Sequence, residues 1–434
     1  MTSSDMTMEP ESVRPLGRAD MLVDTGAGTG SDHQDRHHPW RWAALYFPFG
    51  LTIGFPSIAI GFLASRAGVP LSGIAAIVGA SWFVSSWKWI WAPIGDYTLS
   101  RKVWYRIAIS LVSIGFLALS SIPPGPRTAG LLSLIVLMTS LAGTFIAFSV
   151  EGLMAHNTSL SQRGRAGGWF QSGNQFGQTA GGGLGLFLMT HLPAPWMGGM
   201  VLAALLWLCS LLLGGLQEPQ RPAAHEPLQG KLVDAWRELG VLLRSRSGRT
   251  GLLLAILPIG TGAAQGLFSG LAREWGASAD LVSQVLGMYG GIAIVAGCFV
   301  GGRLADTLSK PWAYAVACGL SALACPVLIL SPRTELGFAI GTLVYTFTLG
   351  MGAATLTAMV LAIIGHGAAA TKINIFFALN TAFSLMMLRV DGWAHDHWGT
   401  VPMLTVEATV GIVCLGLFAW LARSIPGTTL AHEA

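Results

Sequence analysis

Long apolar stretches, separated by short polar turns, recur along the chain from about residue 40 to its end. Each stretch is roughly 20 residues long, which is the length that an α-helix needs to cross a lipid bilayer. The turns contain Gly, Pro or charged residues, which end helices quickly. We expect spans at 42–63, 71–95, 103–122, 129–150, 167–190 and 196–216, and then at 251–271, 282–302, 312–330, 336–364, 373–393 and 401–421. The pattern predicts an all-α integral membrane protein with 12 transmembrane helices in two pseudo-symmetric six-helix bundles.

A turn that carries an acid and then basic residues occurs at matching places in the two halves. In the first half Asp96 is followed by Arg101 and Lys102, and in the second half Asp306 is followed by Lys310. Internal duplication of this kind is typical of secondary transporters. The repeated turn therefore predicts a membrane transporter.

Polar segments outside the spans define the expected domain boundaries. We expect a disordered cytoplasmic tail at 1–39, an N-terminal bundle at 40–216, a cytoplasmic linker at 217–250, a C-terminal bundle at 251–423 and a cytoplasmic tail at 424–434. The linker contains three prolines and then a basic amphipathic piece that could lie along the membrane surface.

The composition excludes an ordinary soluble protein. Hydrophobic residues make up 52% of the 434 residues and charged residues only 11%, against about 25% charged residues in soluble domains. The net charge of +4 comes mainly from the loops, so we expect no nucleic-acid partner. The five cysteines lie in apolar segments without metal-ligand spacing and are interpreted as packing residues.

The basic residues indicate the orientation in the membrane. With both termini inside, nineteen of the 25 basic residues fall in cytoplasmic segments, and the outer turns hold only Arg66, Arg127, Arg273 and Arg333. This bias favours a cytoplasmic amino terminus. We expect a multi-pass protein of the cell inner (plasma) membrane with both termini in the cytoplasm.

Glycines are regularly spaced in the fifth and eighth predicted spans. Gly173, Gly177, Gly181 and Gly185 recur every four residues, and the eighth span has Gly287, Gly291, Gly297 and Gly301. Small residues let helices approach closely in lipid. The ladder therefore predicts close helix crossings, and a smooth stripe could also let one half rock against the other.

Three sequence patches resemble a known family. The acid–basic turns and the twelve spans are similar to the major facilitator superfamily. WKWIWAPIGD at 87–96, VEGLMAHNTSLSQRGRAGG at 150–168 and GMGAATLTAMVLAIIGHGAAATK at 350–372 resemble the AmpG-type muropeptide permeases and the related acetyl-CoA transporters. The resemblance implies proton-coupled uptake of a solute, and permeases of this group also include siderophore importers.

The chain departs from that group at several positions. Where the group carries two acids on the fourth helix, this chain has Ala147 and Glu151. Tyr97 replaces the arginine after the first turn acid, and Gln162 precedes Arg163 where the group has an acid. These departures weaken the case for an acid pair in proton coupling and for muropeptide as the cargo.

Two ionisable residues in the first-half spans are the main functional candidates, because charge in hydrocarbon is costly and must face a partner or a wet cavity. Lys88 could hold an anionic substrate or pair with an acid from another helix. Glu151 could be a proton-coupling acid, or a structural partner of Arg163 or Lys102. The sequence leaves both alternatives open.

The eleventh and twelfth spans carry further charges. Arg389 could bind a cargo carboxylate or phosphate, or form a salt bridge to another helix. Asp391 is two residues away, so the two side chains do not share a helix face. Glu407 is expected near the outer surface in a structural role.

Amide side chains complete the candidate substrate site. Gln171, Asn174 and Gln178 are spaced by three and four residues and form one polar stripe, which in lipid must turn inward to find hydrogen bonds. The stripe could line a cavity or join helices. Gln265 and Asn380 are the further candidates.

The turn residues are interpreted as a gate. An acid at the cytoplasmic end of a helix can hold a basic residue only while that side is closed, so we expect a conformational latch; the alternative is a role only in topology. The gating candidates are Asp96, Arg101, Lys102, Arg163, Asp306 and Lys310.

No phosphate loop, nucleophile elbow or spaced metal-ligand set is recognisable, so we expect a carrier that is not an enzyme and has neither a cofactor nor a bound metal. Without an ATP-binding module, uphill transport must use an ion gradient, with H+ as the expected ion. The expected function is uptake of a small polar or anionic solute by a monomeric secondary transporter through alternating access. A drug or metabolite exporter and a non-transporting membrane sensor or scaffold are the alternatives.

Overall fold

The computed structural model describes residues 38–158, 163–218, 240, 262–364 and 369–423. The described elements are helical throughout, and they follow the predicted spans. The first half comprises α2 (Trp40–Gly54), η1 (Phe55–Ile60), α3 (Gly61–Arg66), α4 (Leu71–Tyr97), α5 (Arg101–Ser121), α6 (Ala129–Asn157), α7 (Arg163–Phe176), η3 (Gly177–Gly181), α8 (Gly182–His191), α9 (Pro195–Ser210) and η4 (Leu211–Leu213).

The second half repeats this arrangement. It comprises η5 (Ala263–Leu267), α12 (Phe268–Leu271), η6 (Ala272–Trp275), α13 (Ala279–Val282), η7 (Ser283–Tyr289), α14 (Gly290–Thr307), α15 (Lys310–Leu330), α16 (Glu335–Ile364), α17 (Ala369–Trp398) and α18 (Thr400–Arg423). The predicted basic piece of the linker and the first part of the seventh span lie outside the described residues. The all-α architecture is confirmed, and the helices are consistent with the predicted count of twelve spans.

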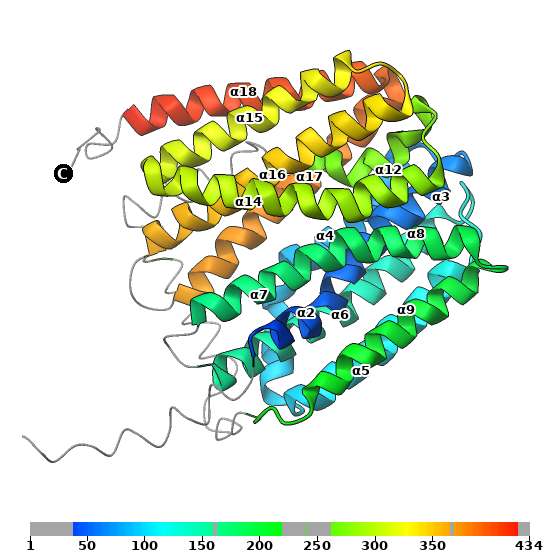
Figure 1. The fold of residues 1–434 in the computed structure, drawn as a ribbon, viewed down its shortest axis with the longest axis vertical. Helices are drawn as coiled ribbons and strands as arrows, with labels where there is room; N and C mark the ends of the chain where they lie inside the picture. The colour runs from blue at the N-terminus through cyan, green and yellow to red at the C-terminus, as the bar shows by residue number, and fades with distance from the viewer. Residues whose placement is uncertain (1–37, 159–162, 219–239, 241–261, 365–368, 424–434) are drawn as a thin grey trace, which may run out of the picture.

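The helices run back and forth between two faces of the molecule (Figure 1). We call the face where α2 begins and α18 ends the terminal face, and the opposite face the distal face. Eight described segments are long and apolar enough to cross a membrane: Trp40–Arg66, Arg101–Ser121, Ala129–Met154, Pro195–Leu213, Ala279–Thr307, Lys310–Leu330, Glu335–Val360 and Thr400–Trp420.

Apolar side chains hold each half together. In the first half Phe55 and Phe116 are fully buried, with their ring centroids 5.0 Å apart. In the second half Phe268 lies edge-on to Tyr345 at 5.0 Å. Since lipid is as apolar as these side chains, tight packing and interhelical hydrogen bonds have to hold the helices together.

Most of the glycine ladder packs within the first half. A Cβ atom on Gly173 would lie 2.6 Å from Ala43 Cα, and one on Gly177 would overlap the carbonyl oxygen of Phe47. Gly181 and Gly185 face Leu51 and Phe55 in the same way. The predicted close crossing is therefore present, but these four glycines face the first helix of their own half and not the other half.

A different glycine pair joins the two halves. A Cβ atom on Gly183 of α8 would lie 2.7 Å from Gly287 Cα and 2.5 Å from the carbonyl oxygen of Ser283. Wider π-helical turns interrupt the helices here, at η3 and η7. We call this contact the Gly183–Gly287 crossing. At this crossing the backbones of the two halves come close together.

Candidate functional site

A cation and an acid face each other inside the first half. Lys88 of α4 lies 3.5 Å from Glu151 of α6, measured from Nζ to Oε1, and both side chains are only partly exposed (19% and 33%). The hydroxyl of Tyr46 in α2 donates to the same Glu151 oxygen at 3.4 Å. Three helices thus bring one cation, one acid and one phenol together. We call these three residues the first-half ion pair site.

An aromatic surface lies beside this site. Tyr46 stacks on Phe170 of α7, with the ring centroids 3.6 Å apart. Further along α7 and η3, the amide of Gln178 donates to Asn174 at 3.1 Å and to Gln175 at 3.2 Å. Two members of the predicted stripe therefore bind each other, while Gln171 is exposed.

The other predicted substrate residues are spread over the second half. Gln265 in η5 and Asn380 in α17 are half-buried, and Arg389 in α17 is exposed. Asp391, two residues from Arg389, is completely buried, as expected for side chains on different faces.

The predicted gating residues lie at or near the terminal face. Arg101 donates to the carbonyl oxygen of Phe148 at 2.9 Å, and its guanidinium occupies the space that a side chain on Gly152 would need. The backbone N–H of Lys102 donates to Glu218 at 3.1 Å.

The second-half turn is more open. Asp306 is exposed, and Lys310 donates to the carbonyl oxygen of Ala305 at 2.5 Å. Asp96 lies in α4 and Arg163 in α7, but their side chains lie outside the described part of the structure.

Glu407 is buried, so the predicted position near the outer surface was wrong, while its structural role stays a prediction. Its side chain is buried in the second half, where three donors surround it. Tyr345 of α16 donates to Oε1 at 2.5 Å, the backbone N–H of Ala264 donates to the same oxygen at 3.4 Å, and the Cys325 thiol donates to Oε2 at 3.9 Å. The error arose because position along the chain gives depth in the membrane but not the neighbours of a side chain.

Asp391 is the second acid of this cluster. Its carboxyl group is completely buried, and neither oxygen has a hydrogen-bond partner among the described residues. It interacts electrostatically with Glu407. We call Asp391 and Glu407 the second-half acid pair; both acids are visible in the sequence, but their contact was not predicted.

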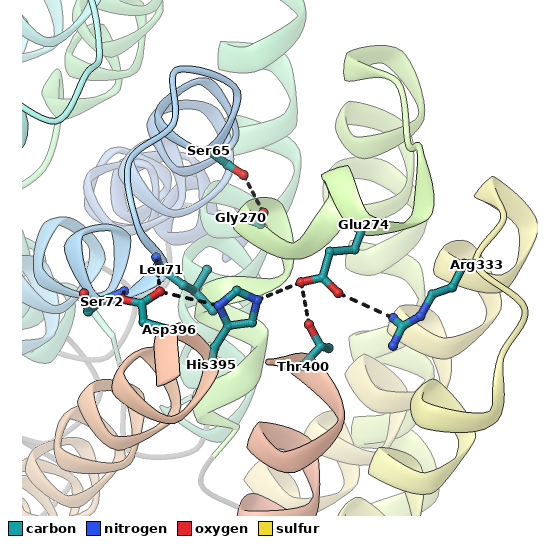
Figure 2. Close-up of polar contacts among 9 residues, drawn as sticks. All are labelled: Ser65, Leu71, Ser72, Gly270, Glu274, Arg333, His395, Asp396 and Thr400. Carbon is teal, nitrogen blue, oxygen red and sulfur yellow. Dashed lines mark hydrogen bonds and ion pairs between the residues drawn. The ribbon is translucent and has the colours of Figure 1, made fainter. Parts of the chain in front are cut away.

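Figure 2 shows a cluster of charged side chains at the distal face. Glu274 of η6 receives hydrogen bonds from His395 at 2.7 Å and from Thr400 at 2.5 Å. Arg333 lies 3.9 Å from the other oxygen of Glu274. On its other side His395 lies 3.5 Å from Asp396. We call Glu274, Arg333, His395, Asp396 and Thr400 the distal cluster.

Asp396 links the distal cluster to the first half (Figure 2). Its two oxygens accept hydrogen bonds from the backbone N–H groups of Leu71, at 2.8 Å, and Ser72, at 3.0 Å. These two groups belong to the first turn of α4, where backbone donors have no partner within the helix. An acid of the second half therefore caps a helix of the first.

Other hydrogen bonds join the halves in the distal part of the molecule. Ser65 donates to the carbonyl oxygen of Gly270 at 2.6 Å (Figure 2). Ser283 donates to that of Gly183 at 2.8 Å. Ser269 donates to the carbonyl oxygen of Ser57. Together with Asp396, these contacts hold the distal face closed.

Hydrogen bonds, and to a smaller extent opposite charges, shift the pKa values in the distal cluster. The hydrogen bond to Glu274 is the main cause that raises the pKa of His395; burial opposes it, and the Glu274 charge and Asp396 add to it. Burial tends to raise the pKa of Glu274, but the hydrogen bonds from His395 and Thr400 and the charges of His395 and Arg333 outweigh burial and lower it. For Asp396, burial is likewise outweighed by the hydrogen bonds from Ser72, Leu71 and His395, and its pKa is lowered. The cluster therefore favours an imidazolium between two carboxylates.

The sequence contains one signal for the distal cluster, the run His395–Asp396–His397, in which three polar, ionisable residues stand together. Its actual partners, Glu274 and the start of α4, are more than a hundred residues away along the chain. The packing of α17 against α4 brings Asp396 to Leu71 and Ser72, and the contact of α17 with η6 brings His395 to Glu274.

Comparison with known proteins gives the same fold. Among solved structures, a POT family transporter in complex with 5-aminolevulinic acid superposes with a TM-score of 0.68 at 11% identity, covering 89% of this chain and 96% of that chain. A D-xylose–proton symporter gives 0.67 at 14% identity (90% and 98% covered), and the nucleoside transporter NupG gives 0.62 at 12% identity (88% and 99% covered). The search of curated protein sequences gave no match.

A family model gives the assignment. The model of the Major Facilitator Superfamily matches residues 42–387, which is most of the chain. The resemblance that the turn motifs indicated is thus confirmed at the level of the superfamily, and the chain is a multi-pass membrane protein with the fold of a transporter. It belongs to the Major Facilitator Superfamily.

Proposed function

We propose that the chain is a proton-coupled secondary carrier that takes up a small polar or anionic solute by alternating access. We place it in the cell inner membrane as a monomer with both termini in the cytoplasm, and we assign it to the AmpG-like group. Muropeptide-, acyl-CoA- and siderophore-like solutes are the cargo classes that the sequence patches favour.

The observation that carries this proposal is the first-half ion pair site. Lys88 and Glu151 come from two different helices and keep partial exposure, so solute and protons can reach them. A charged pair placed between transmembrane helices is costly and marks a pathway for ions or substrate. The stacked Tyr46 and Phe170 rings provide an apolar surface beside the charges.

The pair suggests how proton and solute binding are coupled. While Glu151 is ionised, it neutralises Lys88 and repels an anion. When Glu151 takes up a proton, Lys88 loses its counter-charge, and a carboxylate or phosphate can replace it. Proton binding thus raises the affinity for an anionic solute, and by linkage the solute raises the affinity for the proton. Symport follows if the two leave together at the opposite face.

The test is a counterflow assay in proteoliposomes with muropeptide, acyl-CoA and siderophore panels. We expect saturable exchange of a member of one class, and accumulation driven by a pH gradient. Glu151→Gln should retain exchange and lose the pH-gradient dependence, because the amide cannot take up a proton. The matched control is Glu335→Gln, an acid-to-amide change at the distal end of α16, which should behave like the parent.

Two results would contradict the proposal. Binding without flux would indicate a sensor or scaffold, and flux that runs only outward would indicate an exporter. An unchanged pH-gradient dependence in Glu151→Gln would remove Glu151 from coupling, even if the chain transports.

A further inference from the structure

We propose that Asp391 is a proton-binding site in the second half, and that Glu407 is its ionised partner. The inference rests on the proposed carrier function, to which it adds a second proton site far from Lys88 and Glu151 in the chain. Asp391 takes up one proton on a carboxylate oxygen while the distal face is closed, and it releases that proton when the face opens.

Unequal hydrogen bonding decides which acid holds the proton. Glu407 accepts from the Tyr345 hydroxyl, the Ala264 N–H and the Cys325 thiol. Donors of this kind stabilise a carboxylate. Asp391 has no hydrogen-bond donor among the described residues and is fully buried. An isolated buried carboxylate costs so much free energy that such a group takes up a proton instead.

Repulsion strengthens this assignment. The charge of Glu407 acts on Asp391 through the protein interior, where the screening of charges is weak. Two like charges in such a site are disfavoured, so one proton stays with the pair. With three donors on Glu407, that proton belongs on Asp391.

The surroundings contain no cation that could replace the proton among the described residues near the pair. Cys325 of α15 and Tyr345 of α16 are the other titratable groups that act on Asp391. On α17 itself, Arg389 is exposed, and His395 is a turn further on and engaged with Glu274 and Asp396. On α4, the nearest neighbours of Gly392, which follows Asp391, are Leu71, Ser72 and Ala75, none of which titrates.

Position on α17 links the proton to the distal gate. Leu388 packs near Gly79 of α4, and a Cβ atom on Gly392 would lie 2.9 Å from Ala75 Cβ. Positions 388, 391, 392 and 395 lie along one side of the helix, since residues three and four apart are neighbours. Asp391 is thus at the edge of the surface that α4 covers. If α4 separates from α17, water reaches Asp391 and stabilises its charged form.

The first test needs no cargo. For the purified wild-type chain in nanodiscs, thermal unfolding should become easier as the pH rises, because the folded state holds a proton that the unfolded state has lost. The Asp391 contribution is up to a tenfold change in the unfolding constant for each pH unit. Asp391→Asn mimics the protonated acid and should lose that part of the slope, whereas the control Glu335→Gln should keep it. Equal slopes in the wild type and Asp391→Asn would overturn the proposal.

A second measurement uses the wild-type chain and so does not depend on a variant that folds. In infrared spectra at neutral pH, the C=O band of a protonated carboxylic acid should shift when aspartate carboxyl carbons carry 13C, and should not shift when glutamate is labelled. A missing band, or a band that shifts only with the glutamate label, would contradict the assignment.

Sodium is the ion that could compete with the proton. If sodium stabilises the wild-type chain more than choline does, and Asp391→Asn loses this stabilisation, the site binds sodium and the proton assignment is overturned.

The carrier assay separates this inference from the proposed function. Asp391→Asn should retain counterflow of the exchanged solute and accumulate it less under a pH gradient. If the wild-type chain exchanges no solute, the carrier proposal fails, while the spectra still decide the proton site. If the wild-type chain exchanges solute and Asp391→Asn accumulates it fully, the coupling role of Asp391 fails and the carrier proposal stands.

Discussion

Individual side chains in this molecule act through partners that are distant in sequence. Lys88 meets Glu151, and Glu274 meets His395. Each pair joins two helical elements, so a change of charge at one residue alters how those two elements pack. Protonation of one side chain can therefore change the conformation of the molecule.

The distal cluster predicts that folding stability depends on pH, because Glu274, His395 and Asp396 hold one another within the second half. Because the pKa of His395 is raised, its contribution to folding stability is complete below the ordinary value of 6.5 and is lost as the pH rises through the raised pKa. The lowered pKa of Glu274 means that its contribution is present above 4.5 and is lost as the pH falls through the lowered pKa. Both contributions are complete between 4.5 and 6.5.

The measurement is thermal unfolding of the chain in nanodiscs at a series of pH values. Raising the pH through the raised pKa of His395 should lower the unfolding temperature, and Glu274→Gln should move the midpoint of this change to lower pH. The effect is about 0.2–1 kcal/mol, because these groups are partly exposed. His395→Gln should remove the change that occurs as the pH rises through the raised pKa of His395, because the amide does not titrate. Retention of the full dependence in His395→Gln would rule out this residue as the sensor.

The sequence predicted candidate residues better than it predicted their partners. Lys88 and Glu151 stood out because charge is rare inside an apolar span, and the structure places them together. Glu407 was equally visible, but its environment depends on Tyr345, which is 62 residues away. Hydrophobic periodicity carries no information about such contacts.

At the scale of helices, apolar length predicted most elements, and tertiary hydrogen bonds account for one clear difference. The span expected at 129–150 continues as α6 to Asn157. Asn157 donates to the carbonyl oxygen of Gln217 and accepts from the N–H of the same residue, both at 2.8 Å. Its polar end is thus held by a residue 60 positions away, which the local sequence cannot reveal.

The Gly183–Gly287 crossing gives a prediction at this scale. Gly183→Ala places a methyl group 2.5 Å from the Ser283 carbonyl oxygen and 2.7 Å from Gly287 Cα, so α8 and η7 must separate. Overpacking of this kind costs about 1–3 kcal/mol. We expect a larger distal-open population, measured as a longer electron–electron spin distance between labels at Arg127 and Leu336 in a background in which the native cysteines are replaced.

The matched control for this prediction is Gly416→Ala in α18, where a methyl group meets nothing within 4 Å. It should leave the distance distribution unchanged. A Gly183→Ala variant with the parental distribution would show that this crossing does not hold the halves together.

The acid–basic turn of the second half gives another prediction. Asp306 is exposed while the distal face is closed, which is the state in which a latch at the terminal face is released. Asp306→Asn should therefore slow solute exchange without reducing the amount of protein in the membrane. Exchange rates and membrane content are measured together, and exchange at the parental rate would limit Asp306 to a role in topology.

At the scale of the whole molecule, the duplicated pattern of apolar spans predicted the superfamily fold. The domain boundaries and the orientation stay predictions. The bias of basic residues predicts that residues before α2 and after α18 lie in the cytoplasm. Epitope tags at the two ends should both be protected in intact cells and become accessible after permeabilisation. Tags on opposite sides would contradict the paired six-helix arrangement.

The shared cap on α4 has a consequence for how the molecule opens. Leu71 and Ser72 donate to an acid of the other half, so separation of the halves leaves two backbone donors and a carboxylate without their partners. In a dry gap this would cost several kcal/mol, and water is the ready replacement. The distal entrance should therefore wet before it widens, and any solute that enters must displace bound water at the tip of α4.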